Sequence, residues 1–178
     1  MWCVIVAVML VAPEVVLILG GKEYYESRIV VLPLLACTFF TFLYLLPSTT
    51  EYYLKKTWNI AFATSCIAVL NIILNYFFIK QFGYIAGAYT TLFCYICYFL
   101  FHYLMAKKLI GFQQFDTKII VILAVLLFAV LAVCYVLLDL LVVRWTLMII
   151  FVLVNALLLL KMYKTGKLKG LVGEKNNE

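Results

Sequence analysis

The 178-residue chain is 68% hydrophobic and 12% charged, whereas soluble domains average roughly half apolar and a quarter charged residues. Charge-free stretches of membrane-spanning length recur along it, which excludes an ordinary soluble core and indicates a polytopic membrane protein. The formal charge of +6 does not indicate a nucleic-acid partner, because the placement of cations in a membrane protein matters more than their sum. We therefore expect an all-α membrane helix bundle whose surroundings are the lipid bilayer.

Six transmembrane helices are predicted in chain order, at about 1–20, 28–50, 57–79, 84–106, 118–138 and 142–162. The first helix follows no basic region and contains no convincing small-residue cleavage site, so it is predicted to span the membrane rather than to act as a signal peptide. Residues 1–162 then form the membrane bundle, and residues 163–178 form a polar cytoplasmic tail.

The connections between these helices combine glycine, charged residues and aromatic residues, as is typical of the membrane interface. Glu51 is assigned to the connection after the second helix, and Arg144 to the end of a tight turn, 139–144, that overlaps the start of the sixth helix. A basic and aromatic loop containing Phe112 and Phe115 is expected between the fourth and fifth helices. Loops of this composition suit interfacial positions better than the bilayer core.

The clearest membrane crossing is the hairpin at residues 57–91. Between Lys56 and Lys80 lie 23 uncharged residues, which as a helix extend roughly 34 Å and can cross a hydrocarbon core of about 30 Å. The second run is at least as long, because the next charge after Lys80 is Lys107. A joint of only a few residues, Lys80 to Tyr84, predicts two adjacent antiparallel helices.

The lysines and arginines predict the orientation. If Met1 is cytoplasmic, ten of the 14 cations fall on the cytoplasmic side, as the positive-inside rule requires. The outer side keeps the other four, which are Lys22, Arg28, Lys80 and Arg144. Both termini are therefore predicted to be cytoplasmic.

A stripe of small and polar residues follows one face of the third helix and includes Asn71 and Asn75. One interpretation is that these amides bind neighbouring helices, at about 1 kcal/mol or less for each hydrogen bond. The other is that they line a hydrated path and contact a polar substrate. Both interpretations place the two amides toward the interior of the bundle.

Gly83 and Gly87 open the fourth helix with a small-xxx-small spacing, which favours close helix packing. The tethered third helix is the simplest partner, and a second copy of the chain is the alternative. The two glycines are therefore predicted as helix-packing residues.

Glu14 is the most unusual single residue of the first span. Counting back from Gly21 places it about 10 Å below the outer helix end, and carboxylates at such depth are costly and commonly functional. The alternative is a shallower position, with Pro13 loosening the helix and water reaching the side chain. Glu14, Asn71 and Asn75 are the predicted substrate-path residues.

Other reactive residues point to no chemistry. The six cysteines all lie within apolar runs, so no disulfide framework is expected, and the C-x-x-C spacing of Cys94 and Cys97 lacks the setting of a redox dithiol. His102 is the only histidine, so a metal site is not predicted; a hydrogen bond near the cytoplasmic end of its helix is favoured over a proton relay. No catalytic motif is present, and neither enzyme activity nor a cofactor is expected.

Several local patterns together resemble a known transporter family. They are Pro13-Glu14 with Leu17 to Gly21, Tyr24-Tyr25, Leu43-Tyr44, Glu51 to Thr57, Leu70 to Ile79 and Phe82 to Ala88. In this order the chain resembles the C-terminal part of bacterial oligosaccharide flippases, the O-antigen and capsule transporters of the multidrug/oligosaccharidyl-lipid/polysaccharide exporter superfamily.

The resemblance implies a transporter of about 12 to 14 helices in two lobes, located in the bacterial cytoplasmic membrane. Such a protein moves a polyprenyl-diphosphate-linked oligosaccharide to the outer leaflet for surface polysaccharide synthesis. The six helices here resemble the last six, so the N-terminal lobe would be missing, and the chain is expected to be a fragment or truncation, or one part of a split assembly. A multidrug or cation antiporter of the same superfamily, and a non-transporting membrane scaffold, are the alternatives.

Overall fold

The computed structural model describes residues 1–111 and 116–164, and these residues form six α-helices, one short 3-10 helix and no strand. Each α-helix is long and apolar enough to cross a membrane, which confirms the predicted all-helical chain with six membrane-length helices. The elements are α1 (Trp2–Gly20), η1 (Lys22–Ser27), α2 (Arg28–Tyr53), α3 (Thr57–Phe82), α4 (Ile85–Ile110), α5 (Thr117–Val136) and α6 (Leu141–Lys164).

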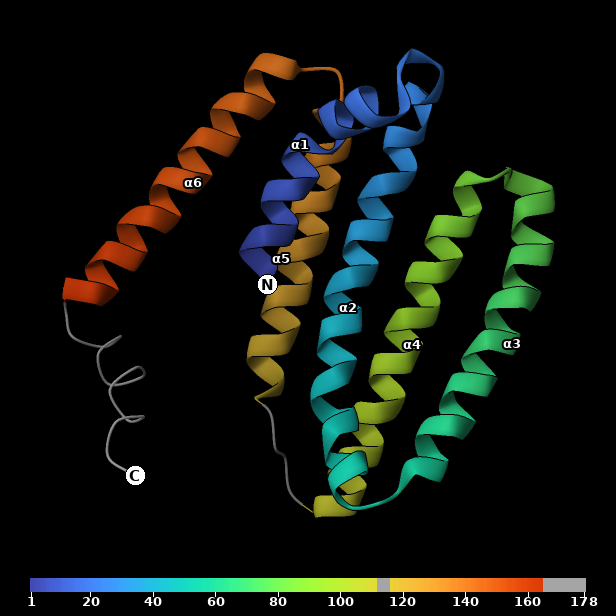
Figure 1. The fold of residues 1–178 in the computed structure, drawn as a ribbon. Coiled ribbons are helices and arrows are strands. Elements are labelled where there is room, and N and C mark those ends of the chain that lie inside the picture. Colours follow the sequence, from blue (N-terminus) through green and yellow to red (C-terminus); the bar gives the residue numbers. More distant parts are fainter. Residues whose placement is uncertain (112–115, 165–178) are drawn as a thin grey trace.

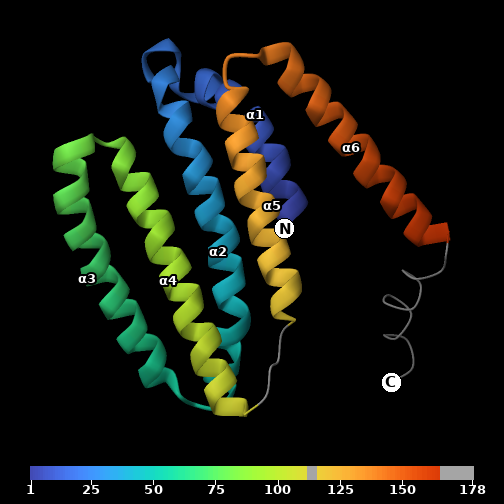
Figure 2. The same ribbon diagram turned by 180° about the vertical axis from the view of Figure 1, so that it is seen from behind.

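Consecutive helices run in alternating directions, and α2 lies at the centre of the bundle (Figure 1). It contacts α1, α3, α4 and α5, and its most extensive contact is with α4. The α6 helix leans away from the other helices and packs against α1, as the reverse view also shows (Figure 2). The bundle therefore consists of a packed centre and two outer helices, α3 and α6.

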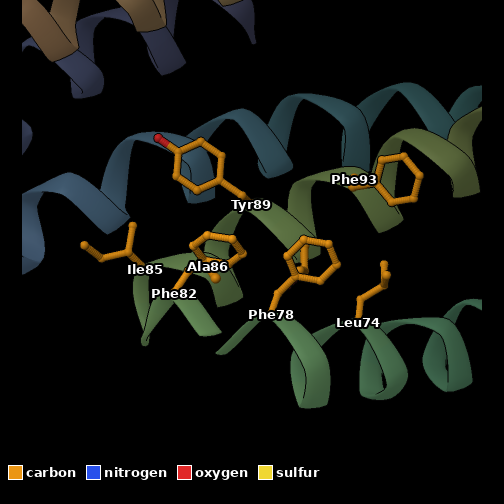
Figure 3. A pocket seen from close by; sticks show the side chains of 8 residues that line it. Leu74, Phe78, Phe82, Ile85, Ala86, Tyr89 and Phe93 are labelled. Atoms are coloured by element: carbon orange, nitrogen blue, oxygen red, sulfur yellow. The ribbon is translucent and has the colours of Figure 1, made fainter. Parts of the chain in front are cut away.

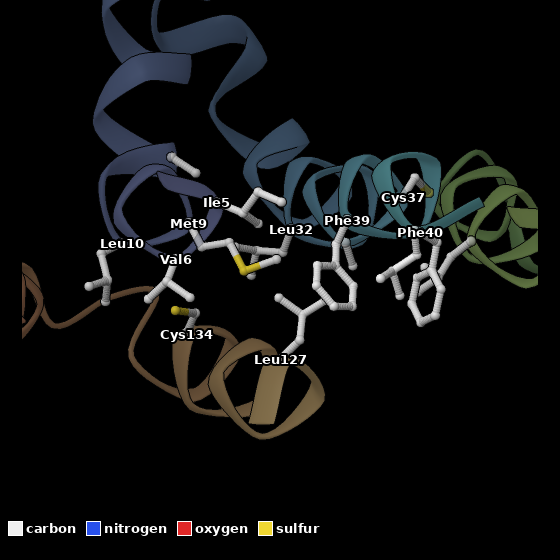
Figure 4. Close-up of a cluster of buried hydrophobic side chains, with 14 of the residues drawn as sticks. Ile5, Val6, Met9, Leu10, Leu32, Cys37, Phe39, Phe40, Leu127 and Cys134 are labelled. Carbon is white, nitrogen blue, oxygen red and sulfur yellow. The ribbon is translucent and has the colours of Figure 1, made fainter. Parts of the chain in front are cut away.

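The packed centre is an apolar cluster contributed mainly by α1, α2 and α5 (Figure 4). Met9, Leu32 and Leu127 are almost completely buried in it. The Phe40 ring extends the cluster toward α4, with its centroid 6.4 Å from that of Phe99. Lipid tails are as apolar as these side chains, so close packing rather than exclusion of water holds such a centre together.

The outer surfaces are also apolar. Of the residues of α3, all of which the structure describes, Ala63 alone is buried. Large side chains such as Trp58, Ile72 and Tyr76 lie exposed along it. An exposed apolar surface of this kind suits lipid or a further helix, which is consistent with a membrane-embedded protein.

Two helices extend beyond their predicted ends, and this corrects two assignments. The α2 helix continues to Tyr53, so Glu51 belongs to the helix and is fully buried rather than lying in a loop. The α6 helix begins at Leu141, so Arg144 lies in its first turn and is 2% exposed, not in a turn outside the bundle. Each charge is paired within the bundle, which makes burial of the charge possible.

The predicted tail at 163–178 begins within α6, which continues to Lys164, and the rest of it lies outside the described residues. Phe112 and Phe115 of the predicted interfacial loop also lie outside them. The adjoining end of α4 is closed by Gly111, whose backbone N–H donates to the carbonyl of Lys107 at 3.0 Å.

The predicted hairpin of two adjacent antiparallel helices is confirmed by the contact between α3 and α4. Its joint is shorter than expected, because α3 continues to Phe82 and α4 begins at Ile85. Gly83 has a φ of 75°, a conformation that residues with a Cβ rarely adopt, and its N–H donates to the carbonyl of Ile79 at 2.9 Å. This glycine is what allows so tight a turn.

Candidate functional site

A cavity of about 340 Å³ lies between α2, α3 and α4, and its walls contain the polar side chains of the hairpin. Its other walls are apolar, small or aromatic, so hydroxyl and amide groups are presented in a partly open recess of an otherwise apolar helix bundle. The lining residues are Tyr44 of α2, Thr64, Ile67, Ala68 and Asn71 of α3, and Thr91, Cys94, Tyr95 and Tyr98 of α4.

The polar groups of this cavity come from both helices of the hairpin. The hydroxyl groups of Thr64 and Tyr98 are 2.7 Å apart and hydrogen-bonded. The Asn71 amide donates at 3.5 Å to the Thr91 hydroxyl and at 3.6 Å to the Cys94 sulfur. The contact to Thr91 is long, whereas 3.6 Å is an ordinary distance for a sulfur acceptor, so Asn71 is held at the α3–α4 contact while its side chain lines the cavity.

Asn75 lies one turn further along α3 and is hydrogen-bonded directly to α4. Its amide donates to Asn71 Oδ1 at 2.9 Å, and its own oxygen accepts from the Thr90 hydroxyl of α4. Asn75 does not line the cavity; it borders a shallow surface groove that also includes Tyr76 and Lys80. The two predicted asparagines thus differ in position, with Asn75 between the helices and Asn71 at the cavity.

The two predicted packing glycines also differ. A Cβ added to Gly87 would lie 3.3 Å from Ile79 Cδ1 and 3.8 Å from Asn75 Oδ1, so this glycine permits the close approach of α4 to α3. A Cβ added to Gly83 would meet nothing within 4 Å. Gly83 lies in the turn rather than in α4, and its role is the backbone conformation described above, not helix packing.

A buried acid–imidazole pair lies beside the polar cavity and joins α2 to α4. Glu51 Oε1 is 2.6 Å from His102 Nδ1, and both side chains are fully buried. The His102 ring centroid is 4.6 Å from that of Tyr98 and 5.9 Å from that of Tyr44, and both tyrosines line the cavity. The hydrogen bond expected for His102 is therefore made to a side chain of the central helix.

Glu14, the third predicted substrate-path residue, lies away from this cavity in a second ionic contact. Its two carboxylate oxygens accept from the two terminal nitrogens of Arg144 at 2.5 and 3.1 Å. Arg144 also donates to the backbone carbonyl of Leu10, 3.3 Å away, close to the point where Pro13 interrupts the hydrogen bonds of α1. The negative charge of Glu14 is therefore paired with the guanidinium of Arg144 on α6.

An apolar groove of about 560 Å³ follows the hairpin near its turn (Figure 3). Phe78 and Phe82 of α3 face Tyr89 and Phe93 of α4 across it. Its lining includes the hydroxyl groups of Thr90 and Tyr89 but no charged side chain, so its chemistry suits an alkyl chain and not a polar head group.

The cysteines form no disulfide in the structure, and Cys94 of the C-x-x-C sequence is buried at the polar cavity. Among the described residues there is no group of three histidine, cysteine or acidic side chains that could hold a metal ion.

The pairing of Glu51 with His102 and of Arg144 with Glu14 was not predicted from the sequence, because Glu51 and Arg144 were each assigned to a loop. A signal was nevertheless present. Glu51 and His102 were both predicted near the cytoplasmic ends of their helices, and Glu14 and Arg144 were both predicted toward the outer side. Opposite charges expected at the same depth are candidates for pairing across helices.

Comparisons with protein-family models, with curated proteins and with solved structures found no match to this chain. The resemblance to oligosaccharide flippases therefore rests on the sequence patterns that carry it.

Proposed function

We propose that the chain is the six-helix lobe of a transporter that moves a polyprenyl-diphosphate-linked oligosaccharide across the bacterial cytoplasmic membrane for surface polysaccharide synthesis. The observation that carries this proposal is the partly open cavity between α2, α3 and α4, to which Asn71, Thr64 and Tyr98 contribute polar groups. Amide and hydroxyl groups beside aromatic rings are suited to hydrogen bonding and stacking with sugar rings.

The outer helices support a second lobe as the partner of this one. The α3 helix is almost unburied, and α6 leans away from the centre, so both leave apolar faces that an N-terminal lobe can cover. Alternating access needs two such bodies that move against each other around a shared site. We therefore propose that transport requires that lobe, and that the polar cavity forms this chain's share of the substrate path.

Binding of the substrate is the first test, with the purified chain in lipid nanodiscs and a polyprenyl-diphosphate-linked oligosaccharide as the ligand. We expect Asn71→Ala to weaken binding about fivefold, as expected for the loss of about 1 kcal/mol from one hydrogen bond. Asn155→Ala is the matched control, because Asn155 is also a membrane-helix amide but donates to Phe151 of its own helix, outside this cavity. Equal binding of the ligand with and without its sugar would contradict the proposal.

Transport is the second test, in a bacterial strain that lacks its own flippase. Surface polysaccharide should return when the chain is produced together with an N-terminal lobe, and not when the chain is produced alone. Full restoration by the chain alone would remove the need for a second lobe but not the substrate assignment.

The two alternatives have less support. A cation antiporter needs a carboxylate that can meet its substrate, yet Glu14 and Glu51 are each held by a basic side chain. A scaffold that associates through Gly83 and Gly87 lacks its surface, because Gly87 is used between α3 and α4 and Gly83 lies in the turn. Binding of organic cations rather than lipid-linked sugar would favour the antiporter.

A further inference from the structure

The Glu51–His102 pair has unused hydrogen-bonding capacity in a fully buried position. Glu51 Oε1 and His102 Nδ1 are bonded to each other at 2.6 Å. The other carboxylate oxygen, Oε2, and the other ring nitrogen, Nε2, are both buried and have no hydrogen-bond partner in the described structure. Unpartnered buried polar atoms are costly, so their presence on both members of one pair calls for an explanation.

One proton changes the net charge of this pair. With a neutral imidazole that donates from Nδ1 to an ionised carboxylate, the pair carries a charge of −1. A further proton makes it neutral, whether it resides on the imidazole or on the carboxyl group. Because Nε2 and Oε2 are free, that proton can bind without breaking the existing hydrogen bond.

The rings that pack against His102 in the described part of the chain are uncharged. Tyr44 of α2 and Tyr98 of α4 are the titratable groups whose rings contact His102, and Phe101 lies 5.5 Å from it. Among the described residues the pair forms no second ion pair. The charged side chains nearest along the chain, at the ends of α2, α4 and the start of α5, are exposed, and these are Lys55, Lys56, Lys107, Lys108, Asp116 and Lys118.

The polar cavity adjoins the pair through two tyrosine rings. Tyr44 and Tyr98 form part of the cavity wall and also contact the His102 ring. The Tyr98 hydroxyl is bonded to the Thr64 hydroxyl, which lines the same cavity from α3. Water in this cavity would therefore reach a hydroxyl group whose own ring packs against the imidazole.

We propose that Glu51 and His102 form a proton-binding site at the contact between α2 and α4, and that the site exchanges its proton through the polar cavity. The site lies between the two helices with the most extensive contact in the bundle. Binding or release of its proton therefore changes the charge buried within that contact. This inference does not rest on the oligosaccharide as substrate and holds for any substrate.

The single histidine makes a direct test possible, because ¹⁵N-histidine labelling of the full chain in lipid nanodiscs yields signals from His102 alone. We expect these imidazole signals to report the binding of one proton in an experiment that covers about pH 4 to about pH 9. In Glu51→Gln, loss of the carboxylate should weaken proton binding about tenfold or more, which is a displacement of at least about one pH unit. The matched control is Glu26→Gln, which removes an exposed carboxylate of η1.

The first decisive measurement is the pH series of the unmodified chain. Imidazole signals that remain unchanged over this range would overturn the proposal, as would an equal midpoint in Glu51→Gln and the unmodified chain. If Glu51→Gln does not fold, ¹³C labelling of the glutamate carboxyl groups in the unmodified chain provides the second measurement. A carboxyl signal that titrates with the imidazole midpoint supports the site, and the lack of any shared midpoint contradicts it.

Discussion

Glu14 and Arg144, 130 positions apart in the sequence, form a two-pronged ion pair that joins α1 to α6. Since α6 packs mainly against α1, this pair is the principal polar attachment of the outermost helix. Arg144 is 2% exposed and the Glu14 side chain 16% exposed, so the charges lie largely out of reach of solvent. The position of α6 therefore depends on a contact between two residues that lie in distant segments of the sequence.

Removal of either partner should destabilise the bundle strongly. Glu14→Gln leaves the Arg144 guanidinium buried without its counter-ion, which should cost about 3 kcal/mol of unfolding free energy. Asp139→Asn is the control, because it removes the Arg28–Asp139 pair near the same end of the bundle, where the Asp139 side chain is 81% exposed. That exposed pair should contribute about 1 kcal/mol or less.

Denaturant unfolding in detergent micelles measures both variants. The exchanged double variant Glu14→Arg with Arg144→Glu should recover part of the loss, because opposite charges again face each other. Equal stability of Glu14→Gln and Asp139→Asn would contradict the assignment of a structural ion pair. Separately, transport that is unchanged in Glu14→Gln across pH would remove Glu14 from the substrate path.

The hydrogen bond between Thr90 and Asn75 is predicted to stabilise the α3–α4 contact modestly. Asn75→Ala removes the acceptor of Thr90 and a donor to Asn71, and Thr90→Val removes the hydroxyl while retaining the shape. Each substitution should cost about 1 kcal/mol, in the range of interhelical hydrogen bonds in membranes. In a double-mutant cycle the two losses should not add, and strict additivity would show that the bond contributes nothing.

The two glycines of the hairpin should respond differently to enlargement. Gly87→Val should destabilise the protein by about 1 to 3 kcal/mol, because the added atoms press against Ile79 and Asn75. Gly87→Ala should be milder, since the Ile79 methyl group can move. Gly83→Ala meets no neighbouring atom but forces alanine into a φ of 75° with a ψ of −172°, a region occupied almost only by glycine, at about 1 to 3 kcal/mol.

Thermal unfolding of these three variants compares the cost of crowding at Gly87 with the cost of the backbone conformation at Gly83. If Gly87→Val is as stable as the unmodified chain, α3 and α4 do not approach each other as closely as the structure indicates.

The orientation predicted from the cations is open to a direct measurement. A fusion of green fluorescent protein after Glu178 should fluoresce, because the C-terminus is predicted to be cytoplasmic. Alkaline phosphatase inserted at the Lys80–Tyr84 turn should be active, because this turn is predicted to face the outer side. If alkaline phosphatase were active after Glu178 and green fluorescent protein fluoresced at the Lys80–Tyr84 turn, the orientation in the membrane would be the reverse of the predicted one. The helix bundle itself would be the same.

The number and approximate limits of the helices follow from the sequence alone. Long uncharged runs leave a backbone in lipid no alternative to satisfying its own hydrogen bonds, so hydropathy and length suffice to predict α3 and α4. The tight joint between them follows from local chemistry as well, because Gly83 can adopt the positive φ that the turn requires. These properties depend on residues close together in the chain.

Which polar residues meet depends instead on how the helices pack. Glu51 and Arg144 lie near helix ends, where hydropathy cannot separate a loop charge from a buried one. Their placement depends on His102 and Glu14, which are 51 and 130 positions away in the chain. A charge enters the bundle only when its partner is already at the same depth, and this condition is a property of the packed helices rather than of either segment.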